Sequence, residues 1–477
     1  MPEKTGFFID GDWVAPAGTQ TMHLINPADE SPGGELLLGD ATDVERAVTA
    51  ARAAFPDYSA SPLSERIALL RRIADLYKQR FDDIGESISR QMGAPRKFAT
   101  RFQAGAGLSH FKQVLTVLES FEFEQKLGNT RVIHEPIGVC GMIVPWNWPM
   151  NQITCKVGPA LAAGCTMVLK ASELAPGPAI ILAEILDEAG VPPGVFNLVQ
   201  GEGPVVGAAL AAHPEVDMIS FTGSTNAGIA VAEAAAPTVK RVGQELGGKA
   251  ANILLDGIDF EDAVTRGVQL CFRNSGQSCN SPTRMLVPAS RLEEVENFAR
   301  SAASQMRVGD PQAADTDLGP VVSNKQWQSI QNHIQRGIDE GASLLHGGPG
   351  RPSEFTKGFY VQPTVFSNVT PEMTIARDEI FGPVLSIMPY ADVDEAIRIA
   401  NDSPFGLAAY VEGPKVDAVR SVARRLRVGM VHINGAVADP AAPFGGYRQS
   451  GNGREWGSHG LSEFTETKAV MGYGEDQ

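Results

Sequence analysis

The sequence predicts an α/β protein built on parallel, doubly wound sheets. From residue 138 onwards, short apolar runs such as 138–144 (GVCGMIV) and 166–170 (TMVLK) alternate with helix-like segments such as 177–190. Strands and helices that alternate through short connections are typical of a parallel sheet covered by helices. A second alternating series runs from about 249 to 434 and predicts another α/β domain. Sheets of this kind bind ligands at the carboxyl ends of their strands.

In the segments that flank the first series, apolar residues recur at different spacings. Residues 41–118 are expected to be helical, because apolar residues such as Ile67, Leu70 and Ile73 recur at helical spacing. Residues 130–136 (TRVIHEP) look like an exposed strand, and the alternating tail 461–473 also predicts a strand.

Composition excludes several classes of protein. A chain of 477 residues is expected to form two or three domains. Its net charge of −16 argues against a nucleic-acid or anionic-membrane surface. The most apolar region, 138–169, is interrupted by prolines and polar residues, so no membrane span is expected. The His and Cys residues lack metal-ligand spacing. Five cysteines without a CxxC pair, and no secretory segment, favour free thiols in the cytoplasm.

Cys279 lies in the polar stretch FRNSGQSCNSPTR, at 272–284. A structural cysteine usually packs in an apolar run, like a small hydrophobic residue. A thiolate attacks electrophilic carbon and leaves readily from the adduct. The polar setting therefore favours a reactive thiol, although an isolated cysteine is more often structural.

Two further side chains have the chemistry that a nucleophilic thiol needs. Glu245, in VGQELGGK, follows an apolar strand and can act as a base if burial raises its pKa. The alternative is a loop carboxylate paired with Lys249. Asn147 stands between Pro145 and Pro149 in VPWNWPMNQ, so its amide is a candidate donor to an oxyanion. The alternative there is an aromatic loop that only packs.

Two strand ends are suited to a nucleotide. The segment 221–228 (FTGSTNAG) supplies glycine, hydroxyls and a probable helix N-terminus, which suit a pyrophosphate. It is not the common GxGxxG pattern. In 169–176 (LKASELAP), Lys170 and Glu173 are placed to hydrogen-bond ribose hydroxyls, or else form a surface ion pair.

Together these motifs resemble the aldehyde dehydrogenase superfamily. PWNWP, KASE, FTGST, ELGGK, FRNSGQSC and EIFGPV occur in the family's order and approximate spacing, and the resemblance covers essentially the whole chain. It implies a Rossmann-like cofactor domain, a second α/β catalytic domain and a small β oligomerisation element. The expected bounds are 1–120 and 138–248 for the NAD-binding domain, 249–445 for the catalytic domain, and 121–137 and 446–477 for the oligomerisation or bridging element.

The resemblance also implies a mechanism. Cys279 would attack an aldehyde to form a thiohemiacetal, whose oxygen is held by the Asn147 side chain and the Cys279 backbone N–H. Hydride transfer to the nicotinamide would leave a thioester. Water activated by Glu245 would hydrolyse that thioester to a carboxylic acid, so a covalent thiol divides one difficult oxidation into two easier steps.

By the same resemblance, NAD is the preferred cofactor. Lys170 and Glu173 match the adenosine-ribose contacts, Glu379 the nicotinamide-ribose contact, and Phe381 a position near the ring. A carboxylate at Glu173 should repel a 2′-phosphate, while Lys170 and Ser172 leave NADP possible. The remaining matching cofactor positions are Trp146, Gly223 and Ser224.

The substrate is less well specified by the sequence. Met150, Trp456 and Phe464 are candidates to line an apolar entrance, which would suit aliphatic or aromatic aldehydes. The alternative is a semialdehyde, because Arg273 resembles an arginine with which succinate-semialdehyde dehydrogenases hold the substrate carboxylate. The second arginine of that clamp is replaced by Cys155 here.

The sequence also allows other activities and more than one oligomeric state. A CoA-acylating relative is disfavoured because such enzymes generally lack the base glutamate, and a thiol hydrolase lacks an identifiable histidine partner. A non-catalytic relative is disfavoured because the three chemical groups are all retained. The resemblance further implies a homodimer or homotetramer, in which 121–137 and the tail contact another subunit; the alternative is two strands within one chain.

Overall fold

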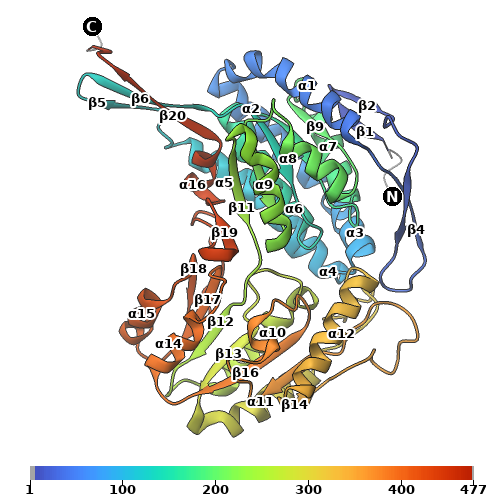
Figure 1. The fold of residues 1–477 in the computed structure, drawn as a ribbon, viewed down its shortest axis with the longest axis vertical. Coiled ribbons are helices and arrows are strands. Elements are labelled where there is room, and N and C mark those ends of the chain that lie inside the picture. The colour runs from blue at the N-terminus through green and yellow to red at the C-terminus, as the bar shows by residue number, and fades with distance from the viewer. Residues whose placement is uncertain (1–5, 475–477) are drawn as a thin grey trace.

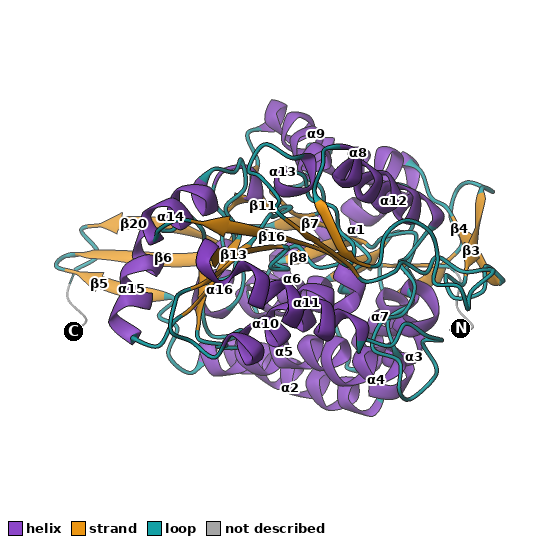
Figure 2. Cartoon of the chain, turned by 90° about the horizontal axis from the view of Figure 1, so that it is seen from below, coloured by secondary structure: helices purple, strands orange, loops and turns teal. Residues whose placement is uncertain are grey.

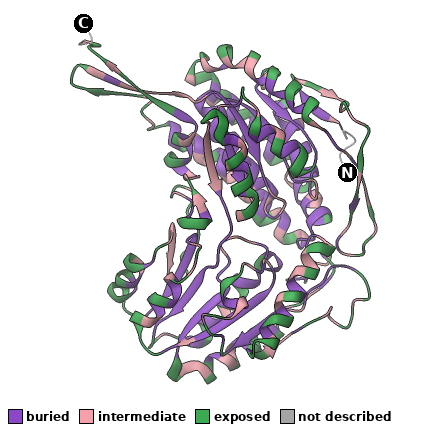
Figure 3. Cartoon of the chain, viewed as in Figure 1, coloured by how far each residue is buried: buried purple, intermediate pink, exposed green. Residues whose placement is uncertain are grey.

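The computed structural model describes residues 6–474, and in this part of the chain the strands form four sheets. The two larger sheets lie in two lobes, and a narrow β-arm projects from the upper lobe in Figure 1. Buried residues follow both large sheets, and exposed residues follow the outer helices and the arm (Figure 3). The mixed α/β fold with two parallel-sheet domains is confirmed.

The first large sheet has the strand order β19-β11-β10-β7-β8-β9-β1-β2. Its central pairs, from β11 to β9, are parallel, whereas β19, β1 and β2 pair in antiparallel fashion. The central strands β7, β8 and β10 are buried throughout, which explains their continuous apolar sequences. The strands are β1 (Phe7–Ile9), β2 (Asp12–Val14), β7 (Val139–Ile143), β8 (Thr166–Lys170), β9 (Phe196–Leu198), β10 (Met218–Thr222), β11 (Arg241–Glu245) and β19 (Gly451–Asn452).

Helices cover this sheet, and the expected helical region 41–118 is confirmed. A π-helical turn, Ala99–Ala104, interrupts it between α4 and α5. The helices are α1 (Ala41–Ser59), α2 (Leu63–Gln79), α3 (Phe81–Met92), α4 (Arg96–Phe98), α5 (Gly105–Leu118), α6 (Pro149–Ala163), α7 (Gly177–Glu188), α8 (Ala208–Ala212), α9 (Thr225–Ala235) and α16 (Gly457–Glu463).

The second large sheet has the order β14-β15-β16-β13-β12-β17-β18 and is parallel except for the edge strand β14. Its strands are β12 (Ala251–Leu254), β13 (Arg284–Pro288), β14 (Ser343–His346), β15 (Thr364–Ser367), β16 (Val384–Tyr390), β17 (Ala408–Glu412) and β18 (Met430–Ile433). The helices of this lobe are α10 (Phe260–Phe272), α11 (Leu292–Ser304), α12 (Asn324–Asp339), α13 (Thr374–Arg377), α14 (Val393–Asn401) and α15 (Val416–Arg425).

The projecting arm is a sheet of β5 (Glu124–Leu127), β6 (Thr130–Pro136) and β20 (Thr465–Met471), seen extending to one side in Figures 1 and 2. The strand expected at 130–136 is therefore present. The last sheet is the hairpin of β3 (Thr21–Ile25) and β4 (Pro32–Leu37). Within the segment 446–477, the residues that precede β20 lie outside the three-stranded sheet of the arm. They form β19, which extends the first sheet next to β11, and α16, which packs on α5 and α6.

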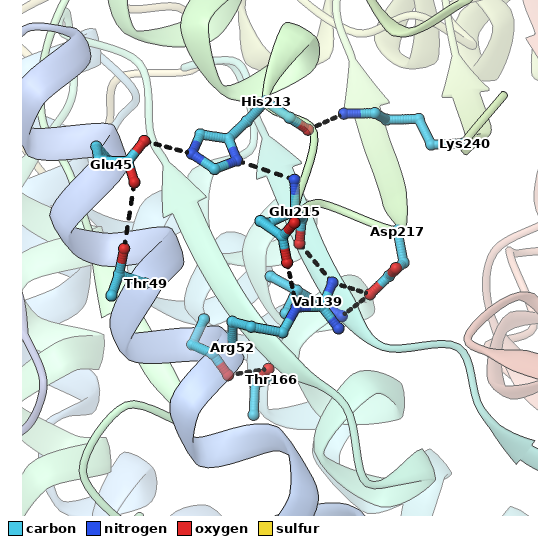
Figure 4. Close-up of polar contacts among 10 residues, drawn as sticks. Glu45, Thr49, Arg52, Val139, Thr166, His213, Glu215, Asp217 and Lys240 are labelled. Carbon is cyan, nitrogen blue, oxygen red and sulfur yellow. Dashed lines mark hydrogen bonds and ion pairs between the residues drawn. The ribbon is translucent and has the colours of Figure 1, made fainter. Parts of the chain in front are cut away.

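A polar network joins α1 to the first sheet at the end opposite the carboxyl edge (Figure 4). The Asp217 carboxylate accepts hydrogen bonds from the Val139 backbone N–H at 2.7 Å and from the Arg52 guanidinium at 2.6 Å. Arg52 also forms an ion pair with Glu215. These contacts fix β7 and β10 in register where both strands begin.

No helix in residues 6–474 is long and apolar enough to cross a membrane. Within the same residues, no group of three or more His, Cys, Asp or Glu side chains is placed to hold a metal ion.

Candidate active site

A cavity of about 300 Å³ lies at the carboxyl edge of the first sheet, between the two lobes. It brings together Asn147, Glu245 and Cys279, which are far apart in the sequence. Its lining residues are Pro145, Trp146, Asn147, Gln152, Thr222, Gly223, Ser224, Glu245, Leu246, Gly247, Cys279, Gln326, Ser329, Glu379, Ile380 and Phe381.

The loop that carries the thiol has an unusual backbone. After α10 ends, Asn274, Ser275 and Gly276 have φ values of 57°, 55° and 72°. Consecutive residues with positive φ are costly and persist only where the surroundings enforce them. A Cβ on Gly276 would approach the Gly382 backbone to 2.1 Å, so only glycine fits there.

Hydrogen bonds to two distant segments, around residue 103 and at 319–322, hold this loop in place. Gln103 Nε2 donates to Asn274 Oδ1 at 2.9 Å, and the Ser275 hydroxyl donates to the Gly319 carbonyl at 2.8 Å. Gln277 Oε1 accepts the Val322 backbone N–H at 3.0 Å. These contacts stabilise the positive φ values of the loop from both lobes, and they thereby fix the position of Cys279.

Asn147 is held rigidly beside this loop. It is buried, and its Nδ2 donates to the Gln277 carbonyl at 3.1 Å. Asn274 Nδ2 donates both to the Asn147 carbonyl, at 3.0 Å, and to the same Gln277 carbonyl, at 3.2 Å. An amide NH₂ has two hydrogens, so the second hydrogen of Asn147 remains able to donate to a ligand oxygen. This is the fixed donor that an oxyanion requires.

Cys279 is half-buried in the cavity. Burial raises the pKa of its thiol, and the charges of Glu379 and Glu245 raise it further. The thiol is therefore protonated at neutral pH, and a nearby base or positive charge is needed before it can attack carbon.

Glu245 is the last residue of β11, and its side chain is buried. Neither carboxyl oxygen hydrogen-bonds to another described residue. Burial raises the pKa of Glu245 well above its usual value, and the nearby Glu455 adds to the shift. The alternative interpretation, an ion pair with Lys249, is not formed: among the described residues the buried Lys249 ammonium has no hydrogen-bond partner, and burial lowers its pKa to about 7. Glu245 is therefore set up to exchange a proton rather than to hold a salt bridge.

Candidate cofactor residues line the cavity from both lobes. Ser224 is the N-cap of α9, with its hydroxyl accepting the Ala227 N–H at 3.3 Å, so the helix N-terminus faces the cavity. Trp146 and Phe381 meet edge to face, with 5.6 Å between ring centroids. Glu379 accepts the Gly248 N–H at 3.0 Å, and burial raises its pKa to about 7.

Lys170 is the last residue of β8, which pairs with β7, and Ser172 and Glu173 follow it; none of the three lines the cavity itself. Lys170 donates to Glu173 at 2.7 Å, and because Lys170 is buried this is not the surface ion pair of the alternative interpretation. This pair lies at the same carboxyl edge as the cavity, where the adenosine part of a nucleotide would extend.

Sequence reasoning missed several residues of this region. Gln326 and Ser329, on α12, line the cavity, and Gln326 donates to the Ile380 and Phe381 carbonyls. The sequence of α12 is rich in polar residues throughout, so nothing in it distinguishes these two as part of a site. Lys156 forms an ion pair with Glu455, whose charge also acts on Glu245. Burial lowers the pKa of Lys156, but Glu455, Cys155 and Glu245 together raise it overall. Lys156 is the only charged residue in the largely apolar sequence of α6, and this feature could have indicated a buried ion pair.

The four candidate substrate residues are in different places. Met150 and Phe464 are fully buried members of the main core, where they contact protein on all sides. Trp456 packs between two other rings, with centroid distances of 4.6 Å to Phe444 and 5.2 Å to His110. Arg273 is exposed next to the thiol loop.

Comparison with known proteins identifies the family. The family model described as the aldehyde dehydrogenase family matches residues 13–470. The chain belongs to the aldehyde dehydrogenase family. It is 56% identical over 99% of both chains to the 3-succinoylsemialdehyde-pyridine dehydrogenase of a Pseudomonas species.

Solved structures agree with this assignment. A mutant of aldehyde dehydrogenase C from Pseudomonas syringae, complexed with NAD⁺ and octanal, is 50% identical with a TM-score of 0.99, over 100% of this chain and 99% of that one. The NAD⁺ complex of the aldehyde dehydrogenase from Bacillus cereus is 36% identical with a TM-score of 0.95, over 98% and 96% of the two chains. This aldehyde dehydrogenase is therefore an oxidoreductase that acts on aldehydes.

Proposed function

We propose that this aldehyde dehydrogenase oxidises its substrate to a carboxylic acid with NAD, through a covalent intermediate on Cys279. The observation that carries the proposal is the single cavity lined by a thiol, a fixed amide donor and an unpaired buried carboxyl group. These three groups are what the formation, stabilisation and hydrolysis of a thioester require.

The side chains have separate roles in this mechanism. Cys279, which is only partly buried, gives its proton to water and attacks the aldehyde carbon, and the resulting oxyanion accepts hydrogen bonds from Asn147 Nδ2 and the Cys279 backbone N–H. NAD, when bound, supplies the hydride acceptor that converts the adduct to a thioester. Glu245 then takes a proton from water as the water attacks the thioester, and release of the acid regenerates the thiol.

The residues present fit a bound dinucleotide. The buried Thr222 hydroxyl has no partner among the described residues and lies in the cavity, beside Gly223 and the N-terminus of α9. The Lys170–Glu173 pair would hold the adenosine ribose, and Glu379 the nicotinamide ribose. Because the Glu173 carboxylate repels a 2′-phosphate, we infer that NAD is preferred to NADP.

Medium-length aliphatic or aromatic aldehydes are the proposed substrates, with a semialdehyde as the second candidate. The octanal complex of the Pseudomonas syringae relative supports the first class, and the semialdehyde in the name of the Pseudomonas relative supports the second. The pair of arginines that holds the substrate carboxylate in succinate-semialdehyde enzymes is not complete here. Cys155 stands in place of the second arginine, and its thiol donates a hydrogen bond to Glu455 at 3.3 Å.

The test is NADH formation with octanal and NAD by the wild-type protein and by Cys279→Ala, together with identification of the product. The proposal requires octanoic acid as product and a loss of activity in the variant. Acyl-CoA formation when CoA is added, or undiminished activity of the variant, would contradict it.

The arm further supports a homodimer or homotetramer. Leu127, Met471 and Tyr473 expose 70%, 76% and 51% of their surfaces on it, an apolar area that a second subunit would cover. A monomeric mass by light scattering would contradict this assignment. The free state of all five cysteines supports a cytoplasmic location.

A further inference from the structure

Gln152 is a buried polar side chain in the wall of the active-site cavity. It lines the same cavity as Cys279 and Glu245, and only 4% of its surface is exposed. Its side-chain amide makes no hydrogen bond with any described residue. Buried amides normally have partners, because leaving one unpaired costs free energy. The unpaired amide therefore indicates that a polar molecule binds beside it in the cavity.

The place of Gln152 on α6 brings it next to the general base. Lys156 lies one helical turn later, so the two side chains share one face of the helix. Burial and the charge of Glu455 raise the pKa of Glu245, and the charge of Lys156 lowers it. The face of α6 that carries Lys156 and Gln152 is therefore the face next to Glu245. Helical side chains lean towards the N-terminus of their helix, so Gln152 extends from there towards Asn147.

Hydrolysis of a thioester needs a water molecule held in one orientation. The water oxygen attacks through a lone pair, so both hydrogens must be directed away from the reacting carbon and accepted by fixed groups. Glu245 can accept one of them, since neither of its oxygens bonds to another described residue. The second hydrogen requires another acceptor beside the carboxylate. The carbonyl oxygen of a glutamine is a neutral acceptor of this kind.

Other polar side chains of the cavity already have a partner or lie elsewhere. Gln326 donates to two backbone carbonyls, and Glu379 accepts a backbone N–H. Ser224 caps α9, and Thr222 lies near the N-terminus of that helix, where the dinucleotide would be held. Among the described residues that line the cavity, Gln152 is thus a neutral acceptor with no other task.

We propose that Gln152 binds the water that hydrolyses the thioester, with its Oε1 accepting one hydrogen while Glu245 accepts the other. The water oxygen bonds to the thioester carbon, one proton passes to Glu245, and the C–S bond breaks to give the carboxylic acid and the Cys279 thiolate. A proton then returns to the thiolate, and no electrons are exchanged in this step. Gln152 is a catalytic residue of the second half-reaction alone. This role rests on the proposed function and deepens it.

The test is a single turnover with the protein in excess over octanal, in which NADH and octanoic acid are followed separately by quenched flow. Gln152→Met keeps the length of the side chain and removes its acceptor. NADH should form at the wild-type rate, whereas octanoic acid should appear about ten- to hundredfold more slowly. Hydroxylamine, a strong nucleophile that attacks thioesters without an oriented water, should restore turnover. The Tm should not fall, because the variant loses no hydrogen bond with a described residue.

Gln152→Glu provides a second, independent readout. It retains an acceptor but places another carboxyl group beside Glu245, and neighbouring like charges raise a carboxyl pKa. The pH at which octanoic acid formation reaches half its maximal rate should therefore move upward. The groups whose charges already act with Glu245 are the same in both proteins: Glu455, Lys156, Arg454, Glu463, Cys155 and Cys279.

Gln79→Met is the matched control, because it makes the same chemical change at the exposed end of α2 and should behave as wild type. The role of Gln152 would be overturned if Gln152→Met formed octanoic acid at the wild-type rate, slowed NADH formation equally, or was not rescued by hydroxylamine. An unchanged pH dependence in Gln152→Glu would overturn it too. Failure of the wild type to form octanoic acid would instead contradict the proposed function, so either hypothesis can fail alone.

Discussion

Replacement of Glu245 by glutamine should separate the two halves of the reaction. The substitution keeps the size of the side chain and removes its ability to accept a proton. Because neither Glu245 oxygen bonds to another described residue, the change breaks no hydrogen bond within them, and folding should be little affected. Formation of the thioester should continue, whereas its hydrolysis should slow.

The expected magnitude follows from the role of a positioned general base. Such a base contributes about 10²- to 10⁴-fold, so the steady-state kcat of Glu245→Gln should fall by that factor, or about 3–5 kcal/mol in the barrier. The wild-type kcat should also rise with pH, because burial raises the Glu245 pKa and only the ionised carboxylate accepts a proton from water. The variant should lose this rise.

The assay is stopped-flow measurement of NADH with octanal in excess. Glu245→Gln should give a burst of about one NADH per active site, followed by a slow steady state. Glu188→Gln, which neutralises an exposed carboxylate at the end of α7, is the control and should behave as wild type. Loss of the burst together with the steady state would refute the assignment of Glu245 to hydrolysis, because it would then act before the thioester forms.

Three other substitutions test separate parts of the structure. Asn147→Ala should lower kcat by about 10²- to 10³-fold in the NADH assay with little loss of stability, because Asn274 still donates to the Gln277 carbonyl; a kcat within twofold of wild type would exclude an oxyanion contact. Glu173→Gln should lower the NAD-to-NADP ratio of kcat/KM by about tenfold, equivalent to about 1.4 kcal/mol, and an unchanged ratio would count against repulsion as the cause of the preference. Asp217→Ala removes the acceptor of the Val139 N–H and should cost about 1–3 kcal/mol in thermal or urea unfolding, more than the exposed pair lost in Glu215→Ala; equal costs would contradict the network in Figure 4.

Much of the fold followed from the sequence because local periodicity and burial agree. The continuous apolar runs became the buried strands β7, β8 and β10, and the helical spacing in 41–118 became α1 to α5. The short β19 could not be predicted, since two residues beside β11 carry no periodicity. Its pairing with β11 depends on the tertiary fold.

The chemical residues were recognisable from their motifs, but their surroundings were not. Nothing local in FRNSGQSC indicates that Asn274 and Ser275 adopt positive φ, because that strain is maintained by Gln103 and Gly319 from distant segments.

The covalent intermediate itself provides the most direct test of the mechanism. Glu245→Gln protein, mixed with octanal and NAD and then acid-quenched, should show by peptide mass spectrometry an octanoyl group on the fragment that contains Cys279. Protein that turns over octanal but remains unmodified, or that carries the acyl group on another cysteine, would contradict the assignment of this thiol as the nucleophile.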